Sequence, residues 1–189
     1  MKAKGPGQSA LLLLDVISVL NKRRIPYAII GAFAASFHGV VRASMDADAV
    51  IASQSGQGIQ VLMAGFRKAG FKSTYREGEV GDPVGAVVAI EDHFKNRVDL
   101  LMNIHGITED VFSRAIDAVF TGARIRLIGL EDFIAMKVFA GGPKDLSDVA
   151  GVLKVSYGRI HMPLLKELVR KYGKGTLGTL ESLLEENRL

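Results

Sequence analysis

The stretch "IIGAFAASFHGVVRASMDADAVI", which runs from Ile29 to Ile51, decides the fold. It begins with apolar residues typical of a buried strand, breaks at Gly31, and continues through small residues that predict a short helix. It ends with two aspartates one residue apart, Asp46 and Asp48, followed by more apolar residues. Because a buried carboxylate is costly unless it is paired or bound to a metal, two of them at the head of an apolar strand require an explanation.

Three acids are candidates for one site. Side chains two residues apart in a strand point to the same face, so Asp46 and Asp48 should project together. Two close carboxylates repel each other unless a proton or a cation lies between them. Asp99, in the apolar segment "RVDLL", would join them if its strand lies beside the first pair. Such a set suits Mg²⁺ and metal-assisted phosphoryl or nucleotidyl transfer. The alternative is that the acids lie at strand ends and face water.

Gly31 is the candidate phosphate-binding position. A strand that runs into a glycine and then a helix leaves free backbone N–H groups where a triphosphate can bind. The alternative for Gly31 alone is a simple turn.

The rest of the chain predicts a mixed α/β (α+β) fold followed by a helical region. The 189 residues are 48% apolar, which suits one domain or a domain with a helical extension. Ser9 is the expected N-cap of the first helix, Thr108 caps a later one, and 123–129 is expected to be a last edge strand. Strands are predicted at 27–31, 46–52, 71–77, 85–92, 96–103 and 123–129, and helices at 10–22, 32–39, 59–70, 108–117, 130–140, 144–156, 163–172 and 176–187.

Composition narrows the classes of function. A net charge of +4 permits an anionic partner such as a nucleotide or RNA without requiring one, and the basic runs Asn21–Arg24 and Arg170–Lys174 are not typical of nucleic-acid arms. The absence of cysteine excludes disulfides, thiolate metal sites and cysteine nucleophiles. The apolar run Ala10–Leu14 is too short for a signal peptide, and no stretch approaches the roughly 18 apolar residues of a membrane span. A soluble, cytoplasmic protein without a membrane partner is expected.

Together, these motifs resemble the nucleotidyltransferase superfamily with the DNA polymerase β-like palm. The resemblance lies in the order strand–Gly–small–helix, then Arg-x-Ser-x-Asp-x-Asp, then a distant strand Asp. The segment "LIGLEDFIAMKVFAGGPKDLSDVAGVL" resembles the AbiEii-type branch, in which a helical lysine, here Lys137, precedes a basic-Asp-x-x-Asp helix, here Lys144 to Asp148. The resemblance spans Tyr27 to Leu153. It implies a small mixed nucleotidyltransferase-type sheet with flanking helices in a catalytic domain at 1–129, and a helical bundle at 130–189.

The resemblance also implies roles for the acids. Asp46 and Asp48 would hold Mg²⁺ on the triphosphate of an NTP donor. Asp99 would complete the metal site and activate the acceptor hydroxyl.

Phosphate contacts are implied for a second group of residues. Gly31 and the N–H of Ala32 would cradle the phosphates, Arg42 would reach a phosphate oxygen, and Lys137 would neutralise developing charge. Asp145 would orient Lys137 or contact the nucleotide. Alternatives that do not involve the resemblance are a solvated loop arginine, an exposed helix cation, and acids favoured by a helix N-terminus.

The expected function is that of an Mg²⁺-dependent nucleotidyltransferase. It would move an NMP from an NTP to a hydroxyl of tRNA, protein or a small molecule, in a toxin–antitoxin or phage-defence setting with an antitoxin partner, and no DNA partner is expected. The alternative is a non-catalytic nucleotide-binding or protein-interaction module of the same fold. Two departures favour it: Ala32, where the family has Gly or Ser, and Ala49, where it prefers a bulky apolar residue. A third hypothesis, an RNA-binding accessory protein, is disfavoured by the modest charge and the lack of an aromatic platform.

Overall fold

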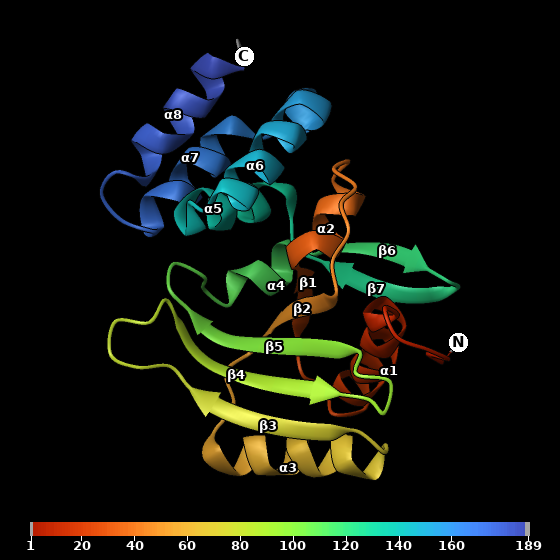
Figure 1. Cartoon of the computed structure of the whole chain (residues 1–189). Helices are drawn as coiled ribbons and strands as arrows, with labels where there is room; N and C mark the ends of the chain where they lie inside the picture. The colour runs from red at the N-terminus through yellow and green to blue at the C-terminus, as the bar shows by residue number, and fades with distance from the viewer. Residues whose placement is uncertain (1, 188–189) are drawn as a thin grey trace.

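The computed structural model describes residues 2–187, and within them the chain forms one seven-stranded sheet and eight α-helices (Figure 1). The predicted mixed α/β class with a helical C-terminal region is confirmed. The strands are β1 Tyr27–Ile30, β2 Asp46–Ile51, β3 Lys72–Glu77, β4 Val84–Glu91, β5 Arg97–Ile104, β6 Ile116–Phe120 and β7 Ala123–Leu127. The helices are α1 Ser9–Lys22, α2 Gly31–Phe37, α3 Gly56–Lys68, α4 Asp110–Arg114, α5 Leu130–Ala140, α6 Pro143–Ser156, α7 Met162–Lys171 and α8 Thr176–Glu186.

The sheet places the two acid-bearing strands side by side. Its order is β3-β4-β5-β2-β1-β7-β6. Strand β2 pairs antiparallel with β1 and parallel with β5. In the parallel register Asp48 stands opposite Asp99, and Asp46 stands opposite Arg97. The strand of the third acid therefore lies beside the strand of the first two, as the three-acid hypothesis requires.

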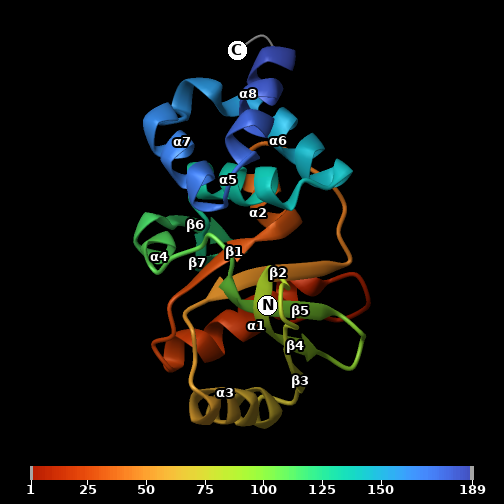
Figure 2. The same cartoon turned by 90° about the vertical axis from the view of Figure 1, so that its left-hand side faces the viewer.

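Two apolar cores cover opposite faces of the sheet. Helices α1 and α3 pack on one face, whereas α2 and the helices α5–α8 lie on the other (Figures 1 and 2). Strand β2 alternates between these faces: Ala47, Ala49 and Ile51 enter the first core. Asp46 and Asp48 therefore point to the face on which α2 and the C-terminal helices lie. Ala49 faces away from the acids and is fully buried, so it belongs to the packing under α1.

Ser9 does not cap α1, contrary to prediction. Gln8 holds the N-cap position, and no side chain among the described residues caps this end. The Ser9 hydroxyl instead donates to the Met45 carbonyl at 2.6 Å and accepts from the Arg97 N–H at 3.1 Å. Both partners lie far from Ser9 in the sequence, so local capping rules could not find them. The contact joins the start of α1 to the starts of β2 and β5.

The hairpin of β6 and β7 corrects two predictions. The predicted helix at 108–117 ends at Arg114, and Glu109 rather than Thr108 holds the N-cap position. Strand β6 follows, and β7 is an inner strand that pairs parallel with β1 and antiparallel with β6. Thr121 and Gly122 join them with φ values of +47° and +82°, which is typical of a tight type I′ hairpin turn. Threonine is uncommon at the first of these positions, so the turn carried a weak signal.

The C-terminal helices follow the predicted order. Gly141, with φ +65°, ends α5, and Pro143 opens α6. The predicted division into domains at residues 129 and 130 stays a prediction, and its outer ends, residues 1 and 188–189, lie outside the described residues. Among residues 2–187, no helix combines the length and the apolar character needed to cross a membrane.

Candidate active site

Gly31 lies directly against Asp48. Its φ is +67°, a conformation that favours glycine, and a Cβ atom there would collide with the Asp48 carboxylate. No other residue type satisfies both constraints. Ala32 follows in the first turn of α2, and no side chain among residues 2–187 caps that turn. Because first-turn N–H groups have no partner inside the helix, the turn brings backbone donors to the acid-bearing strand.

The three predicted acids occupy one face of neighbouring strands. Asp46 accepts a hydrogen bond from the Ser44 hydroxyl at 2.6 Å. Asp48 lies between Asp46 and Asp99, and its pKa is raised to about 6, first by burial and then by the charges of these two neighbours. The site therefore has an excess of negative charge that a cation would relieve.

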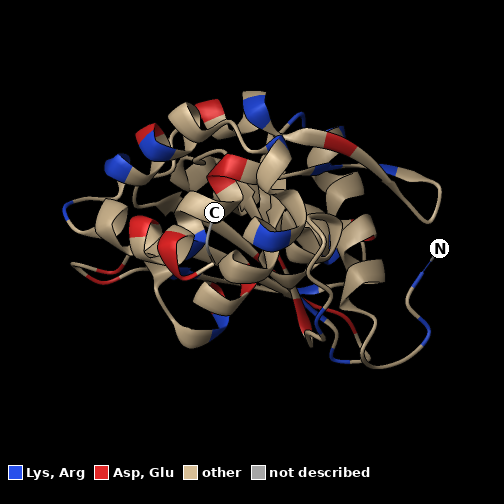
Figure 3. Cartoon of the chain, turned by 90° about the horizontal axis from the view of Figure 1, so that it is seen from above, with Lys and Arg blue, Asp and Glu red and all other residues tan. Residues whose placement is uncertain are grey.

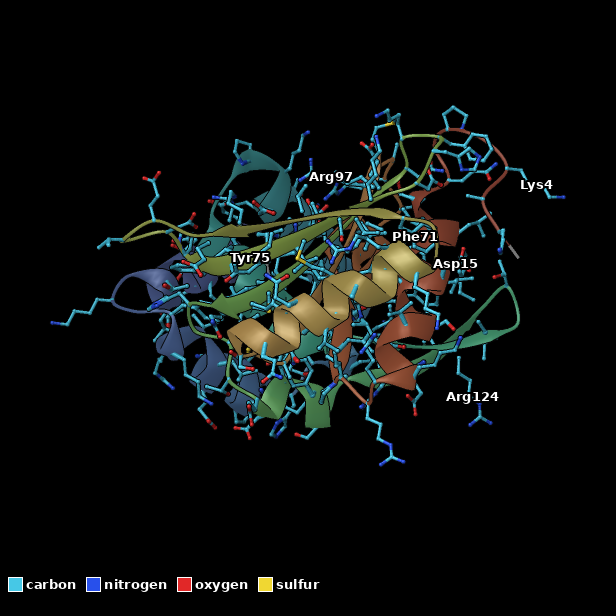
Figure 4. The ribbon with its side chains drawn as sticks, turned by 90° about the horizontal axis from the view of Figure 1, so that it is seen from below. Lys4, Asp15, Phe71, Tyr75, Arg97 and Arg124 are labelled. Atoms are coloured by element: carbon cyan, nitrogen blue, oxygen red, sulfur yellow. The ribbon has the colours of Figure 1, made fainter. Side chains whose placement is uncertain are left out.

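Arg97 is a site residue that the sequence analysis missed. Its Nε donates to both oxygens of Asp99, at 2.9 and 3.1 Å. This contact, together with the attraction of Asp99, Asp46 and Asp48, raises the pKa of Arg97. Its spacing of two residues from Asp99 on one strand is the signal that could have found it. The side chain is 55% exposed, so a ligand can reach it (Figure 4).

A second cluster joins Arg42, Lys137 and two acids. Lys137 Nζ donates to Asp145 at 2.5 Å and lies 3.2 Å from Asp148. Arg42 Nε donates to both oxygens of Asp148, at 3.0 and 3.2 Å. The Lys137 residue is only 7% exposed, which excludes a solvated helix cation.

Asp148 is the centre of this cluster. It is 2% exposed and bonds one cation from the loop before β2 and another from α5. An unpaired buried carboxylate is costly, so Asp148 keeps its bonds to both cations. These bonds fix the positions of Arg42 and Lys137. Both cations oppose the rise of the Asp48 pKa. Lys144, in contrast, is exposed and forms no ion pair within the described part of the chain.

Part of this region is hollow. A cavity of about 140 Å³ is bordered by Ala32, Arg42 and Asp46, with Phe33, Ser36 and Ser44 beside them. Of the predicted phosphate-binding and acidic residues, Ala32, Arg42 and Asp46 therefore border one cavity.

The acids fit a divalent cation in chemical type and lie on adjacent strands, but their side chains do not form a ready cage. Three carboxylates on adjacent strands supply the all-oxygen donors that Mg²⁺ prefers. Within residues 2–187, no group of three acidic or histidine side chains is arranged around a common centre for a metal ion. One reason is visible: Arg97 holds both oxygens of Asp99. A third ligand from Asp99 therefore requires Arg97 to move.

His38 stands apart from this site. Its Nε2 lies 3.0 Å from the Ile128 carbonyl, and the ring is 3% exposed beside Phe133. Burial lowers the pKa of His38, so the neutral ring is favoured. It is a packed core histidine.

A family model covers almost the whole chain. The family described as "Nucleotidyl transferase of unknown function (DUF2204)" matches residues 10–185. Among curated protein sequences, no relative of the chain is found.

Solved structures share the fold at low sequence identity. ANT(2″)-Ia in complex with adenylyl-2″-tobramycin has a TM-score of 0.57 and 16% identity, over 85% of this chain and 94% of that one. An antigenic nucleotidyltransferase-like protein from Paracoccidioides brasiliensis has a TM-score of 0.53 and 16% identity, over 97% and 91%. The lincosamide antibiotic adenylyltransferase LnuA, lincomycin-bound, has a TM-score of 0.50 and 11% identity, over 81% and 99%. At these identities the likeness concerns the fold alone.

Proposed function

Because this chain belongs to the DUF2204 family of nucleotidyl transferases, we propose that it moves a nucleoside monophosphate from an NTP to an acceptor hydroxyl, with Mg²⁺ as the cofactor. The observation that carries the proposal is the meeting of Asp46, Asp48 and Asp99 on one sheet face, with Gly31 against Asp48 and the cations Arg42 and Lys137 nearby.

The acids would hold the metal. Asp46 and Asp48 are its proposed first ligands, and Asp99 is the third once Arg97 releases it. When bound, Mg²⁺ supplies charge neutralisation on the phosphates and polarises the phosphoryl group that is transferred.

The remaining residues would bind the triphosphate. The Gly31–Ala32 turn offers backbone N–H groups to phosphate oxygens, and these donors do not depend on the side chain at position 32. Arg42 and Lys137 are held by Asp148 close to Asp48, so they need little reorganisation to meet negative charge. Asp145 orients Lys137 through their direct hydrogen bond.

The proposed transfer proceeds at the α-phosphorus. The oxygen of the acceptor hydroxyl bonds to the α-phosphorus, and a carboxylate oxygen of Asp99 accepts the proton of that hydroxyl. The bond from that phosphorus to the bridging oxygen of the β-phosphate breaks, and pyrophosphate leaves. The acceptor class is RNA, protein or a small molecule, and the antibiotics named with the neighbours are small molecules to test.

A biological setting is proposed on the resemblance of the segment 127–153 alone. That segment supports the AbiEii-type branch, and with it a toxin–antitoxin or phage-defence role with an antitoxin partner. Co-expression with the product of a neighbouring gene would test it: growth arrest by this chain alone, relieved by the partner, is the expected outcome.

A labelling assay tests the proposed reaction. Purified protein is incubated with each of the four α-³²P-NTPs, Mg²⁺, and total cell RNA and protein, beside an Asp46→Ala/Asp48→Ala control. Label that appears with one NTP and vanishes in the control and in EDTA is expected, and it names the donor and the acceptor class.

The second candidate is a nucleotide-binding module without turnover. The Arg97–Asp99 contact favours this module, because Arg97 occupies the carboxylate that would act as the third metal ligand. Mg·NTP binding by calorimetry, together with no label on any acceptor, would support this module; label that depends on Asp46 and Asp48 would exclude it.

A further inference from the structure

Two basic helix ends meet on the sheet face opposite the acids. Lys22, Arg23 and Arg24 lie at the end of α1, and Arg67 and Lys68 at the end of α3. Figures 1 and 4 both show α1 beside the C-terminal end of α3. The basic run at 21–24 is unremarkable in the sequence, but folding adds a second pair of cations to it. We call these five residues the basic groove cluster.

The cluster lacks compensating acids. Within residues 2–187, none of its five cations takes part in an ion pair, whereas Arg42, Arg97 and Lys137 all do. All five are exposed. On the C-terminal helices, by comparison, cations and acids are interspersed (Figure 3). The basic groove cluster is therefore a local excess of positive charge.

A groove runs between the two helix ends. Its volume is about 520 Å³, and its lining is Val19, Lys22, Arg23, Gly65, Lys68 and Ala69. The absence of a side chain at Gly65 lets the Arg23 guanidinium pack directly against the backbone of α3. A Cβ atom at Gly65 would lie 2.7 Å from Nη2 of Arg23. The groove thus has an apolar floor and cationic walls on both sides.

We infer that this groove binds single-stranded RNA through its phosphodiester backbone. Cations at helix C-termini are favoured by the helix dipole, but that effect requires neither a groove nor two unpaired clusters facing each other. The lining contains no aromatic side chain on which a base could stack, so recognition falls on the phosphates and is independent of base sequence. The opening lies between two adjacent helix ends, which suits one strand rather than a duplex.

Helix α1 connects the groove to the end of the sheet that carries the acidic site. Helix α1 has 14 residues and links the groove to the start of β2 and β5, where Ser9 bonds Met45 and Arg97. A helix of that length spans about 20 Å. A bound strand could therefore be held at the groove while another part of the RNA reaches the acids. The choice of RNA over DNA rests on the proposed function, whereas the binding of a nucleic-acid backbone does not.

A binding measurement separates this inference from catalysis. Fluorescence anisotropy of a labelled 20-nucleotide oligo-U RNA, in EDTA without NTP, reports affinity while no transfer is possible. Lys22→Glu/Lys68→Glu is expected to weaken binding at least tenfold and to flatten the dependence of log affinity on log salt by roughly 1.4, for two phosphate contacts. Arg170→Glu/Lys174→Glu makes the same charge change at the end of α7 and in the loop that follows it, and should weaken binding less than twofold.

A second variant tests the groove itself. Gly65→Leu fills the groove and displaces Arg23 without changing the charge, and it should weaken binding several-fold. Circular dichroism melting of each variant confirms that it is folded.

Three results would overturn the inference. They are no binding by the wild type at low salt, equal losses in the two charge-reversal variants, and unchanged affinity in Gly65→Leu. Phosphate contacts alone predict similar affinities for RNA and the matching DNA strand, so markedly tighter binding of the DNA would overturn the assignment to RNA.

Discussion

The cations of this chain fall into two groups that differ in their surroundings. Arg42 and Lys137 are tied to Asp148 on the acidic face of the sheet, and Lys137 is almost fully buried. Lys22 and Lys68, on the other face, are exposed and unpaired within the described residues. A buried cation must be paired, and pairing fixes its position. An exposed one keeps its freedom and contributes through the field of its cluster. The first group therefore fits the proposed transfer reaction, and the second fits the inferred binding of RNA.

The largest expected effect is at the acids. Asp48→Asn removes a proposed metal ligand and should lower nucleotidyl transfer by roughly 100- to 1,000-fold or more. The same change should raise the free energy of unfolding in EDTA by about 1–2 kcal/mol at pH 7, because it removes a carboxylate whose pKa is raised to about 6. Urea titration and the labelling assay measure the two effects. A variant that loses both activity and stability would show that Asp48 is a structural residue.

The next effect concerns the centre of the paired group. Asp148→Ala leaves Arg42 and Lys137 without their shared partner and should lower the free energy of unfolding by about 2–4 kcal/mol, less than for a fully buried pair because Arg42 keeps some contact with water. Urea unfolding measures it. Asp148→Asn, which keeps the shape and some hydrogen bonds, is the matched control and should cost less. If both variants match the wild type, the paired cluster does not hold the cations in place.

His38 extends the comparison to a buried group that stays neutral. Its folded-state pKa lies below the ordinary histidine value of 6.5, so between the folded and unfolded pKa values the unfolded chain binds more protons. Stability should therefore fall as the pH drops below about 6.5, by at most about 1.4 kcal/mol per pH unit. Urea midpoints at pH 7.5 and 5.5 measure this slope. His38→Gln should flatten it, and an unchanged slope would assign the acid sensitivity to other groups.

The smallest effect should come from the basic groove cluster. Lys22→Ala/Lys68→Ala removes two unpaired, exposed cations and should change the free energy of unfolding by no more than about 0.5 kcal/mol. Urea unfolding beside Asp148→Ala gives the contrast directly. A loss comparable to that of Asp148→Ala would mean that the groove cations are structural, and the division into two groups would fail.

Local patterns gave most of the elements. The run from β1 through Gly31 to β2 was predictable, because apolar strands, a glycine break and a two-residue alternation are all short-range signals. The helices α5 to α8 followed from periodicity and from Gly141 and Pro143 at their junction. The same short range explains one failure. The β6–β7 turn at Thr121 and Gly122 lacks the usual Asn-Gly signature, so the preceding helix was predicted to be too long.

Contacts over long sequence distances could not be predicted in this way. Ser9 looked like an N-cap because capping is local, but its partners are Met45 and Arg97. Asp148 lay within the recognised motif, yet its bond to Arg42 joins residues that are 106 positions apart. No periodicity carries information on such a pairing.

By itself, the sequence determined that this chain has a mixed fold with Asp46 and Asp48 on one face of a strand, because side-chain direction in a strand depends only on residue spacing. Only the tertiary structure decided that Asp99 lies opposite Asp48 and that Arg97 holds Asp99. It alone brought the basic ends of α1 and α3 to one groove. The physical reason is that strand order and helix packing are set by burial of the whole apolar surface, a property of the complete chain and not of any local segment.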